Sequence, residues 1–279
     1  YPISLGNVNS NNYKIYPGTN FRYEFLQLND LKKINNIELK NNTVLFLVGK
    51  NQKTIKSINF YLKNELGNSP VIFVSEFINI NEINYFEHKS GILNSSRIED
   101  IGITGCLNFY DSNLLIKKIE IIRSSCEDGI NIVRSKGDIK NIFIANTVSD
   151  GIDFDYSNIK IEKIKVNQSL GDCIDFSFGK YFISFVEVNG CKDKGISVGE
   201  MSKVEIQSAK LKSTNIGIAI KDSSILEIHE ISENLKNNLC LSLYNKKKEF
   251  EGGKIIIDKI PKNCRENIYS DNISEVFVK

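Results

Sequence analysis

The chain has 279 residues, of which 41% are hydrophobic and 25% charged, and these proportions are typical of a folded globular protein rather than a disordered one. Its formal net charge of +2 argues against nucleic acid as a partner, because a nucleic-acid-binding protein concentrates basic residues on one face. No stretch reaches the ~18 consecutive apolar residues of a membrane-spanning helix, so we expect no membrane span.

The first 80 residues show no regular repeat. Apolar runs at 45–48 and 71–74 predict strands, because Asn, Gly or Pro turn residues bound each run. The open end of a stack of strands invites pairing with other chains. We therefore predict that residues 1–80 form an irregular N-terminal cap and that residues 81–279 form a repetitive domain. The chain starts at Tyr1 without an initiator methionine, which leaves two alternatives, a processed chain or a part of a larger protein or assembly.

A short phrase recurs every 22 residues in the middle of the chain. Its anchor position is held by glycine or cysteine, at Gly129, Gly151, Cys173, Gly195 and Gly217. Strands of alternating apolar and polar residues lie between the anchors, without the 3.6-residue period of a helix. Repeats of this length are typical of solenoids. We therefore predict an all-β fold, a right-handed parallel β-helix with rungs of ~22 residues that are regular from about residue 95 to about residue 245.

The cysteines can be placed within this repeat. Three of them lie in the anchor column, Cys106, Cys173 and Cys240. These three are separated by three turns, ~14 Å, and a disulfide needs Cα atoms within ~7 Å. Cys126 and Cys191 have no evident partner, while the pairing of Cys240 with Cys264 stays open. We expect most cysteines to be small buried thiols that share a column with glycine.

Stacked rungs place equal positions of the repeat in columns ~4.8 Å apart. The residue after the anchor is apolar and faces inward, so the following residue faces outward. The outward positions and the position before the anchor then carry aspartate on several rungs. We call this predicted cluster the acidic face, and it consists of Asp128, Asp150, Asp153, Asp155, Asp172 and Asp175.

Three interpretations of the acidic face are open. The aspartates before the anchor bond their own backbone in turns, and the others form a solvated surface. Alternatively, carboxylates collect a hard cation such as Ca²⁺, with Asp128, Asp150 and Asp172 as the ligands. The third interpretation is catalysis by Asp153, Asp155 and Asp175. Carboxyl groups ~5 Å apart suit a nucleophile with an acid/base, whereas a diagonal pair ~8 Å apart leaves room for a water molecule.

Cationic and aromatic residues lie near the acidic face. A lyase acting on uronic acid sugars needs a positive charge beside the substrate carboxylate, so Lys194 is a predicted catalytic residue. Arg134 and Lys221 are predicted to bind the substrate in the same way. Glu200 lies one rung beyond Phe178 and two beyond Tyr156, and it is also predicted to bind the substrate. We expect sugar rings to stack on these two aromatic residues, which we call the aromatic shelf. The lysines at 246–248 predict a solvated loop tip or a glycan contact.

These phrases resemble a known family. The residues that carry the resemblance are 127–131, 149–155, 171–177, 193–200 and 217–223. They are similar to right-handed parallel β-helix domains of the pectate lyase-like superfamily and, more narrowly, to bacterial β-helix domains found beside CotH-type kinase-like modules. The superfamily includes lyases, hydrolases, epimerases and non-catalytic adhesins, so the resemblance implies the fold rather than the reaction. The Asn-Thr-Asp and Gly-His-Gly motifs of polygalacturonase-like hydrolases are missing, as is the Arg-bearing signature of pectate lyases.

The sequence thus predicts a carbohydrate-active protein that acts on a polysaccharide through the acidic face, as a lyase, hydrolase or epimerase. The alternative is a non-catalytic cell-envelope or adhesin module that binds glycan or structural calcium. With either function we expect a secreted or cell-envelope protein of a bacterium.

Overall fold

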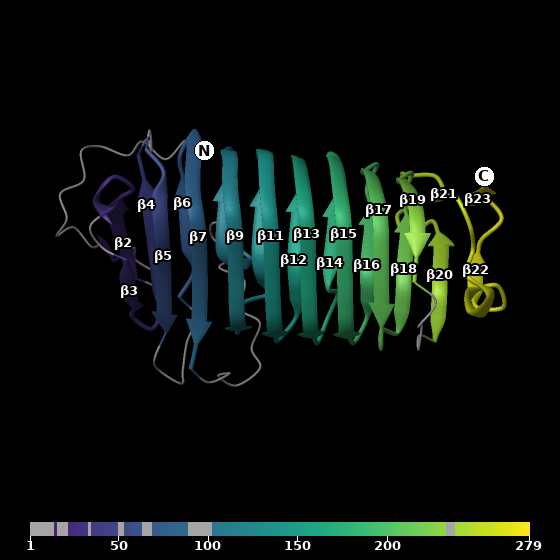
Figure 1. Ribbon diagram of the computed structural model, residues 1–279, viewed down its shortest axis with the longest axis horizontal. Coiled ribbons are helices and arrows are strands. Elements are labelled where there is room, and N and C mark those ends of the chain that lie inside the picture. Colours follow the sequence, from purple (N-terminus) through teal and green to yellow (C-terminus); the bar gives the residue numbers. More distant parts are fainter. Residues whose placement is uncertain are drawn as a thin grey trace.

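A computed structural model describes residues 14–15, 22–32, 35–49, 53–62, 69–88, 102–232 and 238–279. The chain forms a parallel β-solenoid, in which each turn adds one strand to each of two sheets (Figure 1). The turns stack side by side along the long axis of the molecule, from the purple N-terminal strands to the yellow C-terminal ones. The predicted all-β parallel β-helix is therefore confirmed.

The first sheet contains 12 of the described strands and the second contains 11. The strands of the first sheet are β1 (Lys14–Ile15), β2 (Arg22–Gln27), β4 (Thr43–Val48), β6 (Val71–Val74), β8 (Gly105–Tyr110), β10 (Asp128–Val133), β12 (Asp150–Asp155), β14 (Ile174–Ser177), β16 (Lys194–Gly199), β18 (Ile216–Lys221), β20 (Leu239–Tyr244) and β22 (Ile268–Ser270). Those of the second sheet are β3 (Asn36–Leu39), β5 (Ile55–Leu62), β7 (Phe77–Glu87), β9 (Asn113–Ser124), β11 (Lys136–Thr147), β13 (Asn158–Ser169), β15 (Lys180–Cys191), β17 (Lys203–Lys212), β19 (Ile225–Ile231), β21 (Lys254–Ile257) and β23 (Glu275–Val278). Two short 3₁₀ helices are η1 (Asp30–Lys32) and η3 (Lys262–Cys264).

The interior is filled by columns of like side chains that the parallel register stacks above one another. Ile130, Ile152 and Ile174 are paired in successive strands, and each is 0% exposed. The rings of Phe154 and Phe176 stack in the same way, with centroids 5.0 Å apart. The apolar ladder predicted after the anchor position is therefore confirmed.

The anchor position favours glycine because neighbouring rungs approach each other closely there. A Cβ atom on Gly129 would lie 2.6 Å from the carbonyl oxygen of Gly151. On Gly195 it would lie 2.6 Å from the carbonyl oxygen of Gly217. Glycine avoids both clashes because it has no Cβ atom, which explains its return at this position.

The long strands of the second sheet bend along their length. In β13, Ile159 and Ile161 are buried, two successive exposed residues follow at 162–163, and burial resumes at Ile164 and Val166. Two neighbouring outward residues break the alternation that a straight strand requires. Each long strand therefore covers two sides of the coil, and the first sheet covers the remaining side.

The N-terminal strands continue both sheets. β2, β4, β6 and β8 pair in parallel in the first sheet, and β3, β5, β7 and β9 do so in the second. Strands on both sides of residue 80 thus belong to the same two sheets, although the only antiparallel pair of the described strands, β1 with β2, lies at this end. The division into a cap (1–80) and a β-helix (81–279) stays a prediction. The predicted start of the regular rungs near residue 95 lies outside the described residues.

The prediction of buried free thiols is wrong, because all the cysteines form disulfides, Cys106–Cys126, Cys173–Cys191 and Cys240–Cys264. The anchor cysteines do not bridge one another, as expected. Cys173 instead bonds a cysteine 18 residues later, at a Cα distance of 5.5 Å. The repeat does not predict these pairs, because it compares equal positions of successive turns and the two cysteines of each pair occupy different sides of a turn. The pairing of Cys240 with Cys264, which the sequence left open, is present.

We predict that the double variant Cys173→Ala/Cys191→Ala loses about 3 kcal/mol of unfolding free energy, because it reopens a short loop in the unfolded chain. Chemical denaturation without reductant measures this loss. The control is the unaltered chain denatured without reductant, in which a thiol assay should detect no free cysteine. Detection of six thiols there would contradict the disulfide assignment.

Candidate functional site

The acidic face lies on the outer side of β10, β12 and β14. Asn131, Asp153 and Asp175 are paired in successive strands, as are Val133 and Asp155 two residues further along. Paired residues in neighbouring parallel strands are ~4.8 Å apart at the backbone. The predicted columns of carboxylates are therefore confirmed by the strand register.

The aspartates before the anchor position accept hydrogen bonds from the next turn of the coil. The backbone N–H of Asp172 donates to Oδ1 of Asp150 at 2.7 Å. The backbone N–H of Lys194 donates to Oδ1 of Asp172 at 2.9 Å, and its ammonium lies 3.1 Å from the same oxygen. The ammonium of Lys194 also donates to Asp193 at 2.5 Å. Lys194, a predicted catalytic residue, is thus bound to two carboxylates.

The carboxyls further along the strands have fewer partners. The side-chain amide of Asn131 lies 3.4 Å from Oδ2 of Asp153 and 3.5 Å from Oδ2 of Asp155. Oδ1 of Asp153 and Oδ1 of Asp175 are both closed off from solvent and have no hydrogen-bond partner among the described residues. The ammonium of Lys221 donates to the hydroxyl of Ser197 at 2.8 Å and lies 4.0 Å from Asp175.

Burial and mutual repulsion favour the protonated form of several of these carboxyls. Burial raises the pKa of Asp153 well above its ordinary value, and the negative charges of Asp128 and Asp155 add to the shift. Burial raises the pKa of Asp128 in the same way. The pKa of Asp150 rises to about 7, because of burial and the charge of Asp172. Burial also raises the pKa of Asp155. The acidic face therefore holds protons near neutral pH.

The aromatic shelf stands beside the acidic face at the corner that follows the strands of the first sheet. The rings of Tyr156 and Phe178 stack with centroids 4.3 Å apart and planes 9° apart, and Tyr156 is 55% exposed. Both residues have positive φ angles, 51° and 54°, which are rare for bulky side chains. The same corner has φ between 46° and 54° on six rungs, at Asp111, Arg134, Tyr156, Phe178, Glu200 and Asp222.

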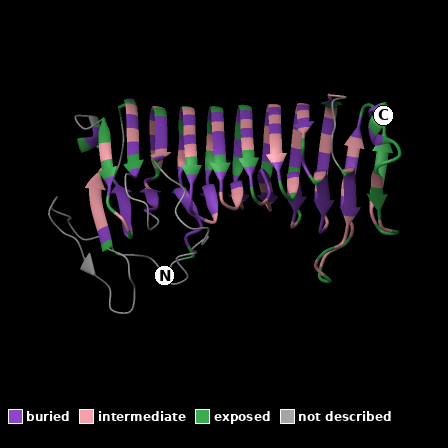
Figure 2. Cartoon of the chain, turned by 90° about the horizontal axis from the view of Figure 1, so that it is seen from below, coloured by how far each residue is buried: buried purple, intermediate pink, exposed green. Residues whose placement is uncertain are grey.

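A loop at residues 245–251 stands over the far end of the acidic face. Figure 2 shows this loop projecting beyond the ends of the strands, and its residues are partly or fully exposed to solvent. Lys247 from this loop forms an ion pair with Glu200 at 2.5 Å, and the ring of Phe250 meets Phe178 edge-on with centroids 6.4 Å apart. Oδ1 of the buried Asp222 accepts the N–H of Lys247 at 2.8 Å and holds the loop in place. No pattern in the repeat indicates Phe250, because its position depends on how the loop folds back.

At the opposite end, Arg134 and Tyr110 border the acidic face. The guanidinium of Arg134 binds both carboxylate oxygens of Asp111 at 2.8 Å and lies 6.0 Å from the centre of the Tyr110 ring. Burial and the nearby charge of Asp155 raise the pKa of Tyr110 to about 12. Sequence reasoning missed Tyr110, although extending the column of Asp155 and Val133 by one rung would have found it.

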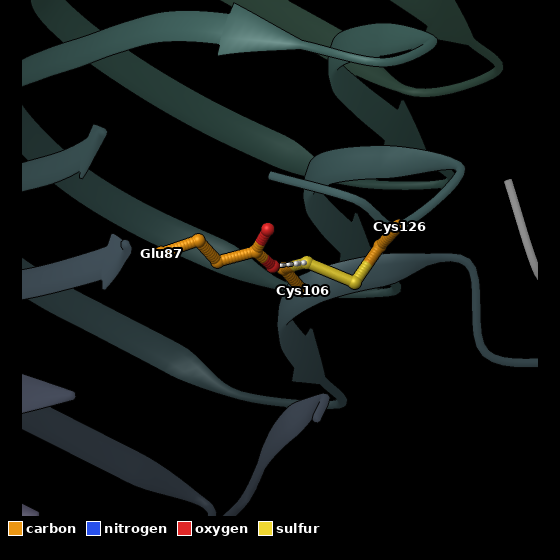
Figure 3. A group of neighbouring side chains, drawn as sticks. All are labelled: Glu87, Cys106 and Cys126. Carbon is orange, nitrogen blue, oxygen red and sulfur yellow. Dashed lines mark hydrogen bonds between the residues drawn. A yellow bond between two sulfur atoms is a disulfide. The ribbon is translucent and has the colours of Figure 1, made fainter. Parts of the chain in front are cut away.

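A second cluster of potential ligands lies inside the coil (Figure 3). Oε1 of Glu87 accepts hydrogen bonds from the N–H and the hydroxyl of Ser125, at 3.2 and 3.0 Å, and lies 3.7 Å from Sγ of Cys106. Burial raises the pKa of Glu87 to about 7. Within the described ranges, Glu87, Cys106 and Cys126 form the only group of three potential donors that lie within 4.8 Å of one another. Because both sulfurs belong to a disulfide, they are not thiolate ligands.

The aspartates of the acidic face do not converge in this way, since no three of them bring one oxygen each within 4.8 Å of one another. The assignment of Asp128, Asp150 and Asp172 as ligands of Ca²⁺ stays a prediction. Two grooves of about 580 and 680 Å³ lie on the outside of the second sheet, where both include Asp138 and Lys160, and neither contains a residue of the acidic face. Among the described residues no helix is long and apolar enough to cross a membrane.

Comparisons of the chain with known protein families, with curated proteins and with solved structures found no match. The resemblance to pectate lyase-like domains and to those beside CotH-type modules therefore stays a prediction. What the structure shows is the parallel β-solenoid itself.

We predict that Asp150→Asn stabilises the protein at about pH 8 by roughly 1 to 3 kcal/mol and has little effect near pH 4. The folded pKa of Asp150, about 7, exceeds the ~3.9 of an unfolded aspartate, so the unfolded chain releases this proton first as the pH rises. Stability contributed by the protonated group is present below pH ~4 and is lost by pH ~7.

Urea denaturation of both proteins at the two pH values measures this difference. The control is Asp138→Asn, which removes an exposed carboxyl on β11 of the second sheet and should not change the pH dependence. A lower stability of Asp150→Asn at pH 8 would show that the ionised carboxylate stabilises the fold.

Proposed function

We propose that the protein hydrolyses a polysaccharide on the acidic face, with the sugar chain resting on the aromatic shelf. The observation that carries this proposal is that a carboxyl and an exposed aromatic ring are consecutive residues at one corner. Asp155, whose pKa burial raises, directly precedes the 55%-exposed ring of Tyr156. A flat exposed ring pair offers a surface on which sugar rings stack, and a raised pKa lets a carboxyl keep its proton to a higher pH, as a general acid requires.

In this mechanism Asp155 donates its proton to the glycosidic oxygen, and Asp175 acts as the base. Asp175 lies on the next rung and is displaced diagonally by two residues, because its direct partner is Asp153. A diagonal pair on neighbouring strands is ~7–8 Å apart, which is the separation that leaves room for a water molecule in an inverting glycosidase. Asp153 has a positioning role, because it is paired with Asp175 and hydrogen-bonded to Asp155. This hydrogen bond lowers the pKa of Asp155, whereas the negative charge of Asp175 raises it.

Hydrolysis fits the cations of this region better than elimination on a uronic acid. A lyase needs a positive charge that is free to neutralise the substrate carboxylate. Lys194 forms ion pairs with Asp172 and Asp193. Nε and Nη2 of Arg134 donate hydrogen bonds to the two carboxylate oxygens of Asp111. These cations already have carboxylate partners within the protein.

The disulfides support a location outside the reducing cytosol. Three disulfides within 279 residues are common in secreted and cell-envelope proteins and rare in cytosolic ones. We therefore propose that the protein is secreted or belongs to the cell envelope. Polysaccharides occur in the same locations.

The second candidate function is a non-catalytic module that binds glycan. It is favoured by the position of the two grooves, which lie on the second sheet and not over the acidic face. It is also favoured by the closed-off Oδ1 atoms of Asp153 and Asp175, because part of each carboxyl cannot reach a substrate.

We predict that Asp155→Asn and Asp175→Asn each lower kcat on a responsive polysaccharide by about 10²- to 10⁴-fold, the usual contribution of an acid or base. The measurement is release of reducing ends from a glycan panel. Asp138→Asn serves as the matched control and should retain full turnover. Full turnover by both active-site variants would contradict the catalytic proposal. Glycan binding without any cleavage would favour the second candidate function.

We predict that Tyr156→Gly weakens glycan binding by about 5- to 30-fold, because it removes a ring contributing ~1–2 kcal/mol of contact. Thermal stability should be maintained or increased, since glycine adopts the positive φ of this position without strain. Tyr156→Phe, which keeps the ring, should bind as the unaltered chain does. Tyr269→Ala removes another exposed ring, 51% exposed on β22, and equal loss of binding in that variant would disprove a special role of the shelf.

A further inference from the structure

The acidic face contains more carboxyls than cations. The cations nearest to it are each engaged by an acidic side chain, Lys194 by Asp172, Lys221 by Asp175 and Lys247 by Glu200. Within the described ranges no lysine, arginine or histidine forms an ion pair with the remaining four carboxyls, those of Asp128, Asp150, Asp153 and Asp155. The region is thus acidic although the whole chain carries a net charge of +2.

A buried atom without a partner also points to a missing donor. Oδ1 of Asp153 and Oδ1 of Asp175 are closed off from solvent and accept no hydrogen bond from the described residues. The two aspartates are direct partners in neighbouring strands, so both oxygens belong to the same part of the face. Buried polar atoms normally have a partner, because an unsatisfied one is costly. The chain itself thus supplies no hydrogen-bond donor to these two oxygens. Both aspartates are partly exposed, so a donor bound from solvent would meet the accessible atoms of the same carboxyls.

A metal ion fits this arrangement poorly. Ca²⁺ takes six to eight oxygen ligands at short distance. No three carboxyls of the acidic face bring one oxygen each within 4.8 Å of one another. An ammonium group makes smaller demands, because its three N–H donors need only two or three acceptors and the rest of its shell can be water.

The aromatic shelf indicates what carries the ammonium group. Tyr156 follows Asp155 directly in the chain, and its ring stacks on that of Phe178. A ligand that rests on these rings and reaches the carboxyls therefore combines a flat ring with a positive charge beside it. A hexosamine with a free amine has both features, and a protonated amine is further attracted by the faces of aromatic rings.

We propose that the polysaccharide recognised on the acidic face is an amino-sugar polymer with free, protonated amines, which supply the missing cations beside Asp153 and Asp155. This inference rests on the proposed function and specifies its substrate. It excludes uronic acid polymers, because the cations beside the acidic face are already engaged and leave no positive charge for a substrate carboxylate.

Calorimetric titration of the whole chain with three polymers of equal length tests the inference. The polymers are β-1,4-linked glucosamine, its N-acetylated form and polygalacturonate, at one ionic strength. We expect the free-amine polymer to bind at least about 10-fold more tightly than the N-acetylated one, because N-acetylation removes the charge-assisted hydrogen bonds. Polygalacturonate should not bind.

The double variant Asp153→Asn/Asp155→Asn should lose at least about 10-fold in affinity for the free-amine polymer, whereas the control Asp138→Asn should not. Circular dichroism checks that the variants keep their β structure. Equal loss in the control would overturn the inference, since the polymer would then bind in the grooves that Asp138 lines or follow general charge attraction. Tyr156→Gly should weaken binding of the free-amine polymer and leave polylysine unaffected.

Other outcomes separate this inference from the proposed function. Tighter binding of the N-acetylated polymer or of polygalacturonate, still lost in the double variant, would overturn the amino-sugar inference and leave the polysaccharide function standing. Failure to bind any of the three polymers would count against both. Polylysine binding as tightly as the amino-sugar polymer, or Ca²⁺ displacing that polymer at equal concentration, would overturn the inference in favour of a basic peptide or a metal ion.

Discussion

The parallel register between successive turns is the constraint on which the rest of the structure depends. Each strand pairs with an equivalent strand ~4.8 Å away, so every side chain lies above and below its counterparts in the neighbouring turns. Inside the coil this favours columns of one kind, such as the isoleucines at 130, 152 and 174 and the stacked rings of Phe154 and Phe176. Outside the coil the same register brings equal charges together. The acidic face is the result of this second effect.

The chain offsets part of the resulting repulsion. Asp150 and Asp172 accept backbone N–H groups of the following turn, so these two carboxyls stabilise the stacking of the rungs. Lys194 ends their column with a positive charge. Asp153 and Asp155 receive long contacts from Asn131 and share a hydrogen bond with each other, and burial raises the pKa of both. The stacking of the turns therefore explains Asp150 and Asp172. It does not require Asp153 and Asp155.

Much of the fold and part of the site could be predicted from the sequence, because both follow from the period of the repeat. The spacing of Gly129, Gly151 and Cys173 fixed the register, and the register placed Asp153 beside Asp175. The disulfides were missed because a repeat compares equal positions, whereas Cys173 and Cys191 occupy different sides of a turn. The loop at 245–251 was missed because its path is set by non-repeating contacts, such as those of Asp222. Ion pairs such as Arg134 with Asp111 depend on side-chain conformations that a column cannot specify.

The corner beside the acidic face shows how such a coil can change its ligand. Its six rungs share nearly one backbone conformation, yet they carry two aspartates, an arginine, a tyrosine, a phenylalanine and a glutamate. The conformation is therefore imposed by the coil and not by the side chain, so replacing one non-glycine residue with another changes the outer surface without altering the path of the chain. Selection can exchange a ring for a charge at this corner while the interior stays constant. Solenoids with the same interior and different corners would then recognise chemically unrelated polymers.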